Sequence, residues 1–216
     1  MTIKKYLFSI LGAVVVGGFS SVALAQGSAS AGSGKVAVCV ACHGQDGNDS
    51  LLPAVPKLGG QGEKYLLKQL QEIKSGERPV PLMTGMLDNL SEQDLADVAA
   101  FYADQEQALG AVEEEKRSLG ESIYRGGVAN IGVAACSACH APNGQGNAAA
   151  GYPALSGQDV AYTEAQLKAF RDGARNNDQA EVMRAIVARL NDREIAALAS
   201  YVSGLRYFRQ DSAKIG

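Results

Sequence analysis

Two pentapeptides of the form Cys-x-x-Cys-His constrain this chain more than any other feature of its sequence. They occupy Cys39–His43 and Cys136–His140, and together they contain all four cysteines and both histidines of the 216 residues. The pattern is the attachment signature of c-type haem, in which both thiols form thioethers to the porphyrin and the adjacent histidine becomes an axial ligand of the iron. The sequence therefore predicts two covalent haem c groups. The residues predicted to bind them are four thioether cysteines and two proximal histidines, Cys39, Cys42, Cys136, Cys139, His43 and His140.

Zinc sites, disulfides and thiol redox enzymes also use short cysteine motifs. A zinc site requires ligands from both copies to meet at one metal, because each copy offers only two cysteines and one histidine. A thiol oxidoreductase normally places its Cys-x-x-Cys beside a βαβ pattern, and no strand-rich run is present. Haem attachment is the leading hypothesis, and these three classes are its alternatives.

The N-terminus has the layout of a secretory signal peptide. Two lysines precede an apolar run over residues 6–19, and the small-residue segment Ala23-Leu24-Ala25 follows. Cleavage is expected after Ala25, which assigns residues 1–25 to the signal peptide and the mature chain to the periplasm. The apolar run is short for a membrane span and no later run reaches its length, so a soluble mature protein is expected; an uncleaved anchor is the alternative.

Charge is distributed unevenly along the chain. Without residues 1–25 the chain has 18 basic and 23 acidic side chains, and with this sign and no basic cluster nucleic acid is not an expected partner. Residues 26–112 carry 6 basic and 11 acidic side chains, whereas residues 113–216 carry 12 of each. Such a dipole orients encounters with charged molecules, and the hypothesis is that the two halves face different partners.

Apolar spacing predicts helices along the rest of the chain. Residues 26–34 are glycine, alanine and serine apart from Gln26, a composition typical of a loose leader, and a helix is expected over Lys35–His43. Residues 63–76 have helical spacing and a glycine stop at Gly76. The last helix of the first half is expected to begin after Ser91, which with Asp94 has the capping-box pattern. Residues 109–112 are the expected linker, and acidic residues 113–115 open the next helix.

The second half repeats the first. Pro153–Gln158 follows the similar segment Pro56–Gln61 by 97 residues, and the same offset relates Arg175 to Arg78. Three extra residues then enter before Met183, after which the offset is 100. Each copy is near the lower size limit for a single core, so a buried porphyrin in each would supply the missing apolar surface.

The second axial ligands of the two irons are assigned by elimination. With both histidines used, methionine, lysine, water or an open site remain, and methionine opposite histidine is the usual pairing in electron-transfer haem. Met1 leaves with the signal peptide, and the second half contains only Met183. Met83 aligns with Met183, whereas Met86 falls opposite Ile186. We therefore expect Met83 and Met183 to be the ligands and Met86 to be a packing residue.

Other repeated residues are candidates for supporting roles. Pro56 and Pro153 each lie 13 residues after a haem histidine, where a backbone carbonyl can accept the other ring N–H and fix the imidazole; turn formation alone is the alternative. Six polar residues recur in both halves and are candidates either for holding haem propionates or for surface and packing roles. They are Gln61, Gln158, Tyr65, Tyr162, Arg78 and Arg175.

The whole pattern resembles the di-haem cytochrome c4 family. Each Cys-x-x-Cys-His is followed by Pro-x-Leu-x-Gly-Gln and then by a methionine seven residues before Leu-Ser or Leu-Asn. The resemblance covers essentially the whole mature chain. It implies an all-α fold of two tandem class I cytochrome c domains, residues 26–110 and 111–216, related by pseudo-twofold symmetry, each around one haem c, with the propionate edges meeting at the domain interface. It also implies a periplasmic carrier that passes single electrons from a quinol-oxidising cytochrome bc complex to a terminal haem-copper oxidase.

Two other functions are alternatives to the carrier. A di-haem peroxidase needs a vacant or displaceable iron position, and this chain has no spare histidine to act as acid or base near peroxide. A haem subunit of a larger dehydrogenase, for instance one with a flavin on a partner chain, has the same two-domain pattern. A carrier in which a methionine occupies the remaining ligand position of each iron needs no small-molecule substrate.

The C-terminal segment 205–216 mixes aromatic and basic residues and is a candidate contact with a partner or a membrane surface, with packing on its own domain as the alternative.

Overall fold

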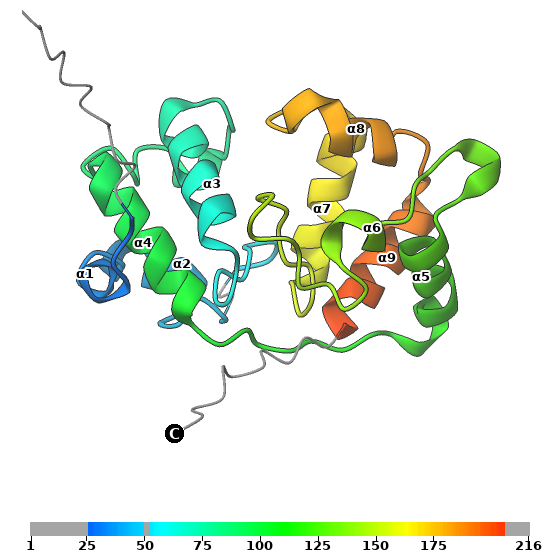
Figure 1. Ribbon diagram of the computed structural model, residues 1–216, viewed down its shortest axis with the longest axis horizontal. Helices are drawn as coiled ribbons and strands as arrows, with labels where there is room; N and C mark the ends of the chain where they lie inside the picture. The colour runs from blue at the N-terminus through cyan, green and yellow to red at the C-terminus, as the bar shows by residue number, and fades with distance from the viewer. Residues whose placement is uncertain (1–25, 50–51, 206–216) are drawn as a thin grey trace, which may run out of the picture.

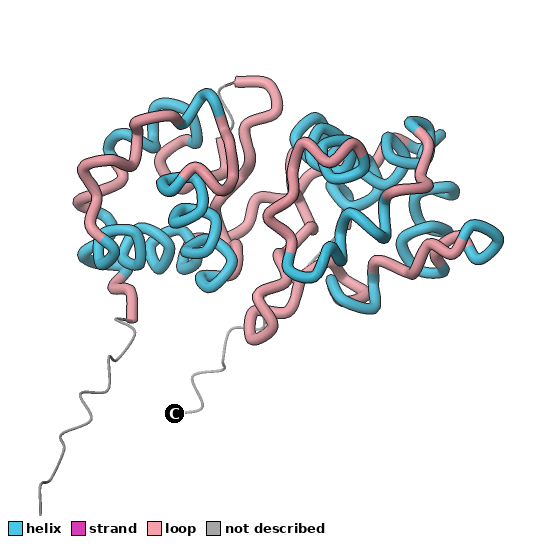
Figure 2. The backbone as a smooth tube through the Cα atoms, turned by 90° about the horizontal axis from the view of Figure 1, so that it is seen from above, coloured by secondary structure: helices cyan, strands magenta, loops and turns pink. Residues whose placement is uncertain are grey.

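A computed structural model describes residues 26–49 and 52–205 as two helical lobes side by side, joined by one extended connection (Figure 1). The predicted signal peptide and the aromatic and basic residues of the C-terminal segment lie outside the described residues. Within the described ranges both lobes consist of helices and loops, and neither lobe contains a β-strand (Figure 2). No described helix is long and apolar enough to cross a membrane. The fold is therefore all-α, as the family resemblance implied.

Each lobe contains one half of the repeat. The first lobe has four α-helices and one 3-10 helix: α1 (Ala29–Ser33), α2 (Ala37–His43), α3 (Glu63–Ser75), η1 (Pro81–Met83) and α4 (Glu92–Asp104). The second has α5 (Glu114–Gly126), η2 (Ala129–Ile131), α6 (Ser137–His140), α7 (Val160–Arg171), η3 (Gln179–Glu181), α8 (Val182–Val187) and α9 (Asp192–Gly204). Helix α4 packs on α1 and α3, and its counterpart α9 packs on α5 and α7.

The predicted helix ends are confirmed where a capping residue specifies them. Ser91 and Asp94 form the expected capping box at the start of α4, and Asn191 and Glu194 form the same box at α9. Gly76 ends α3 in the left-handed conformation, with φ of 81°. The helix that carries the first haem motif begins two residues later than predicted, at Ala37.

Both cores consist of apolar side chains from the elements that surround the Cys-x-x-Cys-His motifs. Val36 and its counterpart Val133, each three residues before a motif, are buried. In the first lobe the buried cluster contains Val36, Leu66, Val98, Ala99 and Tyr102, with Cys39 packed against it. In the second lobe Cys136 and Met183 pack against the equivalent cluster. One predicted thioether cysteine therefore borders the hydrophobic core in each lobe, and in the second lobe the predicted methionine ligand does so as well.

The prediction that residues 26–34 form a loose leader is wrong. These residues contain α1, which lies across α4, and a Cβ on Gly32 would lie 2.1 Å from the Asp97 carbonyl oxygen. The second lobe has the same crossing, since a Cβ on Gly120 of α5 would lie 2.3 Å from the Ala197 carbonyl oxygen. The small residues of this segment do not make it a flexible leader, because they allow two helix backbones to approach closely.

Candidate haem sites

The two predicted proximal histidines occupy the same environment in the two lobes. His43 ends α2 and His140 ends α6, and both side chains are buried. The Nδ1 atom of His43 lies 2.9 Å from the Pro56 carbonyl oxygen, and that of His140 lies 2.9 Å from the Pro153 carbonyl oxygen. The predicted proline contacts are therefore confirmed. Because a carbonyl oxygen only accepts hydrogen bonds, Nδ1 carries the proton and Nε2 keeps its lone pair for a ligand.

Burial favours the neutral form of both imidazoles. It lowers the pKa of His43 and of His140 below the ordinary value, against the opposing effect of the proline carbonyls. A neutral imidazole is the form that coordinates a metal. Both histidines are therefore held in the tautomer and protonation state that an axial ligand requires.

All four cysteines are half-buried and free of disulfide bonds. Burial raises the pKa of the Cys39 thiol, and it raises that of Cys136 to about 11. Within the described ranges no three His, Cys, Asp or Glu side chains gather as a group that could hold a metal ion. The two motifs thus form two separate sites, one in each lobe, rather than converging on a single zinc ion.

The candidate methionine ligands are less exposed than the methionine assigned to packing. Met83 ends η1 and Met183 lies in α8, and both side chains are half-buried, whereas Met86 is 49% exposed. Met83 borders a hollow of about 440 Å³ that Arg78 and Leu87 also line. These positions are consistent with the ligand assignment.

Two glutamine side chains make reciprocal contacts between the lobes. The side-chain amide of Gln61 donates to the Ala154 carbonyl (3.0 Å) and accepts from the Ala154 N–H (2.8 Å). Gln158 makes the mirror pair with Lys57, at 2.9 Å and 2.8 Å. Since Gln158 and Ala154 are the repeat equivalents of Gln61 and Lys57, each contact occurs twice with the lobes exchanged. This exchange is the pseudo-twofold symmetry that the resemblance implied.

Two buried arginines cross the same interface. Arg78 donates to the Tyr162 hydroxyl at 3.0 Å, and Arg175 donates to the Tyr65 hydroxyl at 3.1 Å. Gln69, whose role the sequence did not indicate, accepts from both guanidinium groups at 2.8 Å and 3.0 Å. Burial alone would raise the pKa of the Tyr65 hydroxyl, but the charges of Arg175 and Arg78 outweigh it and hold the pKa below its usual value.

The residues present fit haem c. Neither Arg78 nor Arg175 forms an ion pair with a carboxylate of the described residues, although both are buried. A buried cation without a counter-charge is costly, and carboxylate groups such as haem propionates would supply that charge. Together with free thiols and neutral imidazoles in each lobe, this donor set matches the chemistry of two haem c groups.

Comparisons with known proteins agree with this arrangement. The Cytochrome c family profile matches residues 29–104 and again residues 127–206. Cytochrome c4 of Azotobacter vinelandii is 52% identical over 198 residues, which cover 87% of this chain and 94% of the relative. The crystal structure of cytochrome c4 from Pseudomonas stutzeri superposes with a TM-score of 0.81 at 52% identity, covering 83% of this chain and all of that one.

A more distant relative has a different name. The thiosulfate dehydrogenase electron acceptor of Thiomonas intermedia is 33% identical over 176 residues, which cover 78% of this chain and 79% of the relative. The higher identity and coverage belong to the cytochromes c4. The chain therefore belongs to the cytochrome c4 family, electron-transfer proteins rather than enzymes, with two tandem cytochrome c domains and haem c as cofactor.

Proposed function

We propose that this chain is a periplasmic carrier with two covalently attached haem c groups, which passes single electrons from a quinol-oxidising cytochrome bc complex to a terminal haem-copper oxidase. The observation that carries the proposal is the repeated histidine site, a buried imidazole whose Nδ1 faces a proline carbonyl at 2.9 Å in both lobes. A bound haem supplies one-electron chemistry at its iron. The protein supplies two equivalent attachment sites in one chain.

The haem-binding residues are assigned by type within each lobe. The thiols of Cys39, Cys42, Cys136 and Cys139 form the thioethers. The imidazole Nε2 atoms of His43 and His140 and the thioether sulfurs of Met83 and Met183 are the axial ligands. The greater burial of Met83 than of Met86 supports the choice between the two methionines of the first lobe. A closed pair of ligands suits an electron carrier, because no small molecule needs to bind the iron.

The buried arginines at the lobe interface are assigned to the haem propionates. Arg78 and Arg175 are buried cations, and their guanidinium groups donate directly only to neutral oxygens of tyrosine, glutamine and asparagine side chains among the described residues. Two propionate-bearing groups meeting there would be neutralised by residues of both lobes. The sequence left open whether these arginines bind propionates or only pack, and their lack of a carboxylate partner favours propionate binding.

The domain boundary and the compartment are also part of the proposal. We assign residues 26–110 and 111–216 to the two domains. Asn48 of the first lobe accepts from the Ala108 N–H at 2.9 Å, and Ser200 of the second accepts from the Glu113 N–H at 2.9 Å; these two contacts support a boundary between Ala108 and Glu113. Periplasmic location rests on the predicted signal peptide over residues 1–25. The excess of acidic residues in the first half is assigned to docking with a basic partner.

Haem quantitation with carbon monoxide addition tests the carrier function. The purified protein is expected to contain two covalent haems and to give a reduced spectrum that carbon monoxide leaves unchanged. Met83→Leu should open one iron to carbon monoxide and lower its reduction potential, whereas Met86→Leu serves as the matched control and should do neither. A wild-type protein with one carbon monoxide-reactive haem would contradict the carrier and favour a catalytic site.

One observation favours a second function. The thiosulfate dehydrogenase electron acceptor relative supports the alternative that this chain is the di-haem subunit, or dedicated acceptor, of a larger dehydrogenase. Affinity purification from the native periplasm separates the two functions. A carrier is recovered alone at moderate salt, whereas a subunit is recovered in stoichiometric complex with a dehydrogenase chain.

A further inference from the structure

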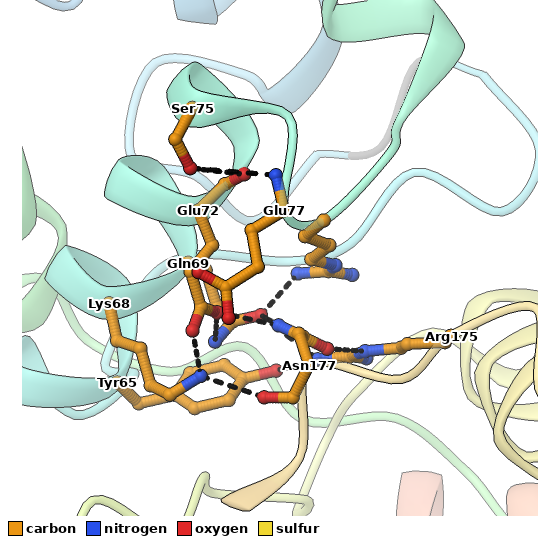
Figure 3. A network of polar contacts seen from close by, with 9 residues as sticks. Tyr65, Lys68, Gln69, Glu72, Ser75, Glu77, Arg175 and Asn177 are labelled. Atoms are coloured by element: carbon orange, nitrogen blue, oxygen red, sulfur yellow. Dashed lines mark hydrogen bonds and ion pairs between the residues drawn. The ribbon is translucent and has the colours of Figure 1, made fainter.

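A cluster of buried polar side chains at the lobe interface, drawn in Figure 3, does not follow the pseudo-twofold symmetry. Asn177 donates through Nδ2 to the Glu72 carboxylate at 2.6 Å and to the Gln69 side-chain oxygen at 3.0 Å. Arg175 donates through Nε to the Asn177 side-chain oxygen at 2.9 Å. Glu72, Asn177 and Arg175 therefore form a chain of hydrogen bonds that crosses from the first lobe to the second.

The repeat contains no counterpart of this cluster. Glu72 corresponds to Ala169, and Lys68, which forms an ion pair with Glu72, corresponds to Ala165. Asn177 follows Arg175 by two residues in the segment with the three extra residues, whereas Val80 occupies that place after Arg78. No described side chain accepts from Nε of Arg78 as Asn177 accepts from Nε of Arg175. The two arginines thus make equivalent contacts across the interface, but only Arg175 has its Nε–H bound by a described side chain.

We propose that Glu72 and Asn177 are positioning residues for Arg175, and that they make the two haem environments unequal at an interface whose glutamine and arginine contacts are symmetric. The inference rests on the proposed function, in which Arg78 and Arg175 face haem propionates. Glu72 adds a buried negative charge on one side only, and Asn177 fixes the direction of one guanidinium plane. A planar guanidinium pairs with a carboxylate in a defined geometry. Because only Arg175 is held in a fixed orientation, the propionate that pairs with it would experience a different electrostatic field from the propionate that pairs with Arg78.

Side-chain hydrogen exchange tests the positioning directly. In the reduced, haem-loaded protein the Arg175 Nε–H should exchange more slowly than the Arg78 Nε–H in 15N NMR spectra. Asn177→Val removes the acceptor and Glu72→Ala removes the group that holds it, so each should speed the exchange of Arg175 about tenfold, as expected for one lost hydrogen bond. Glu72→Gln keeps an acceptor for Asn177 and should restore most of the protection. Equal exchange in the wild type and all three variants would overturn the proposal.

Reduction potentials test the consequence for the haems. Asn177→Val carries no charge change and should alter the separation between the two midpoint potentials. Glu72→Gln removes a buried charge and should raise both midpoints, by unequal amounts. Glu77→Gln is the matched control, since it removes the same charge from an exposed position five residues along the same lobe, and the separation should stay as in the wild type.

The outcomes distinguish this inference from the function on which it rests. A wild-type protein without two haems contradicts the proposed function. The positioning role alone is contradicted if the wild-type protein has two haems but Asn177→Val leaves the separation between the two midpoint potentials unchanged, and Glu72→Gln shifts the midpoints no differently from Glu77→Gln. If Asn177→Val or Glu72→Ala does not fold, the nearly isosteric Glu72→Gln decides between these results, because it must shift the two midpoints unequally.

Discussion

The paired amides of Gln61 and Gln158 give the sharpest prediction about how the two lobes are held together. Each side chain is buried and makes one donated and one accepted hydrogen bond to the backbone of a single residue in the other lobe. Leucine has nearly the same volume as glutamine but cannot form these bonds. Gln61→Leu would therefore leave the N–H and the carbonyl of Ala154 without their partner while keeping the packing.

The size of the effect on lobe docking follows from the two backbone groups of the other lobe that lose their partners. A buried donor or acceptor left unsatisfied costs about 1–3 kcal/mol, and partial access of water at the interface favours the lower end, so we expect a loss of about 2–4 kcal/mol of lobe docking for each substitution. By the pseudo-twofold relation, Gln158→Leu should lose the same amount with respect to Lys57. Gln71→Leu is the control, since Gln71 is exposed and bonds only to Glu92, and it should change stability by less than about 0.5 kcal/mol.

Guanidinium unfolding of the haem-loaded protein, followed by Soret absorbance and by far-ultraviolet circular dichroism, measures this loss. The wild type is expected to unfold with coincident transitions, and either variant should separate them as the lobes become independent. The reasoning would be refuted by a variant with the wild-type midpoint and coincident transitions. Clearly different losses in Gln61→Leu and Gln158→Leu would refute the symmetry of the interface.

Two further predictions concern the helix crossings. Gly120→Ala places a Cβ 2.3 Å from the Ala197 carbonyl oxygen and should lower the free energy of unfolding by about 1–3 kcal/mol. Gly126→Ala in the same helix is the control, since its Cβ meets no atom within 4 Å, and it should change the free energy of unfolding by less than about 1 kcal/mol. Thermal denaturation measures both changes. The hydrogen bond from Lys35 is the main reason that the pKa of Asp97 lies below its ordinary value of 3.8. The stability that Asp97 contributes is thus complete above pH 3.8 and is lost as the pH falls through the lower pKa of the folded state. The α1 amides should therefore lose their protection from hydrogen exchange in acid, and in Lys35→Gln this loss should begin at a higher pH than in the wild type. Protection factors that do not change with pH would contradict this reasoning.

Sequence reasoning succeeded where the information is local. Ser91 and Asp94 specify a helix start within four residues, and the capping box is found there. The spacing of 13 residues from His43 to Pro56, repeated in the second half, made the carbonyl contact one of two alternatives, and the structure contains that contact. In each case the chemistry of a few neighbouring residues fixes the geometry without knowledge of the rest of the fold.

It failed or stayed open where the partner is distant in the sequence. The crossing of α1 over α4 depends on Gly32 meeting the backbone of Asp97, and composition alone made this segment resemble a flexible leader. The roles of Arg78 and Tyr162 could not be decided because these residues meet each other across the lobe interface, 84 positions apart. Periodicity identifies the face that a helix buries but not the residue that it contacts.

The repeat itself indicates where the two domains differ in function. A twofold interface between identical domains would contain every contact twice, as it does for the glutamine amides and the arginines. Three lysine contacts occur in one direction only, since Lys57, Lys64 and Lys68 of the first lobe donate to carbonyls of the second and their equivalents are Ala154, Ala161 and Ala165. A covalent connection keeps each first domain beside its own second domain at high effective concentration. Each side of the interface can therefore carry different residues, and the asymmetric cluster at Glu72 can tune one haem environment without a matching change in the other.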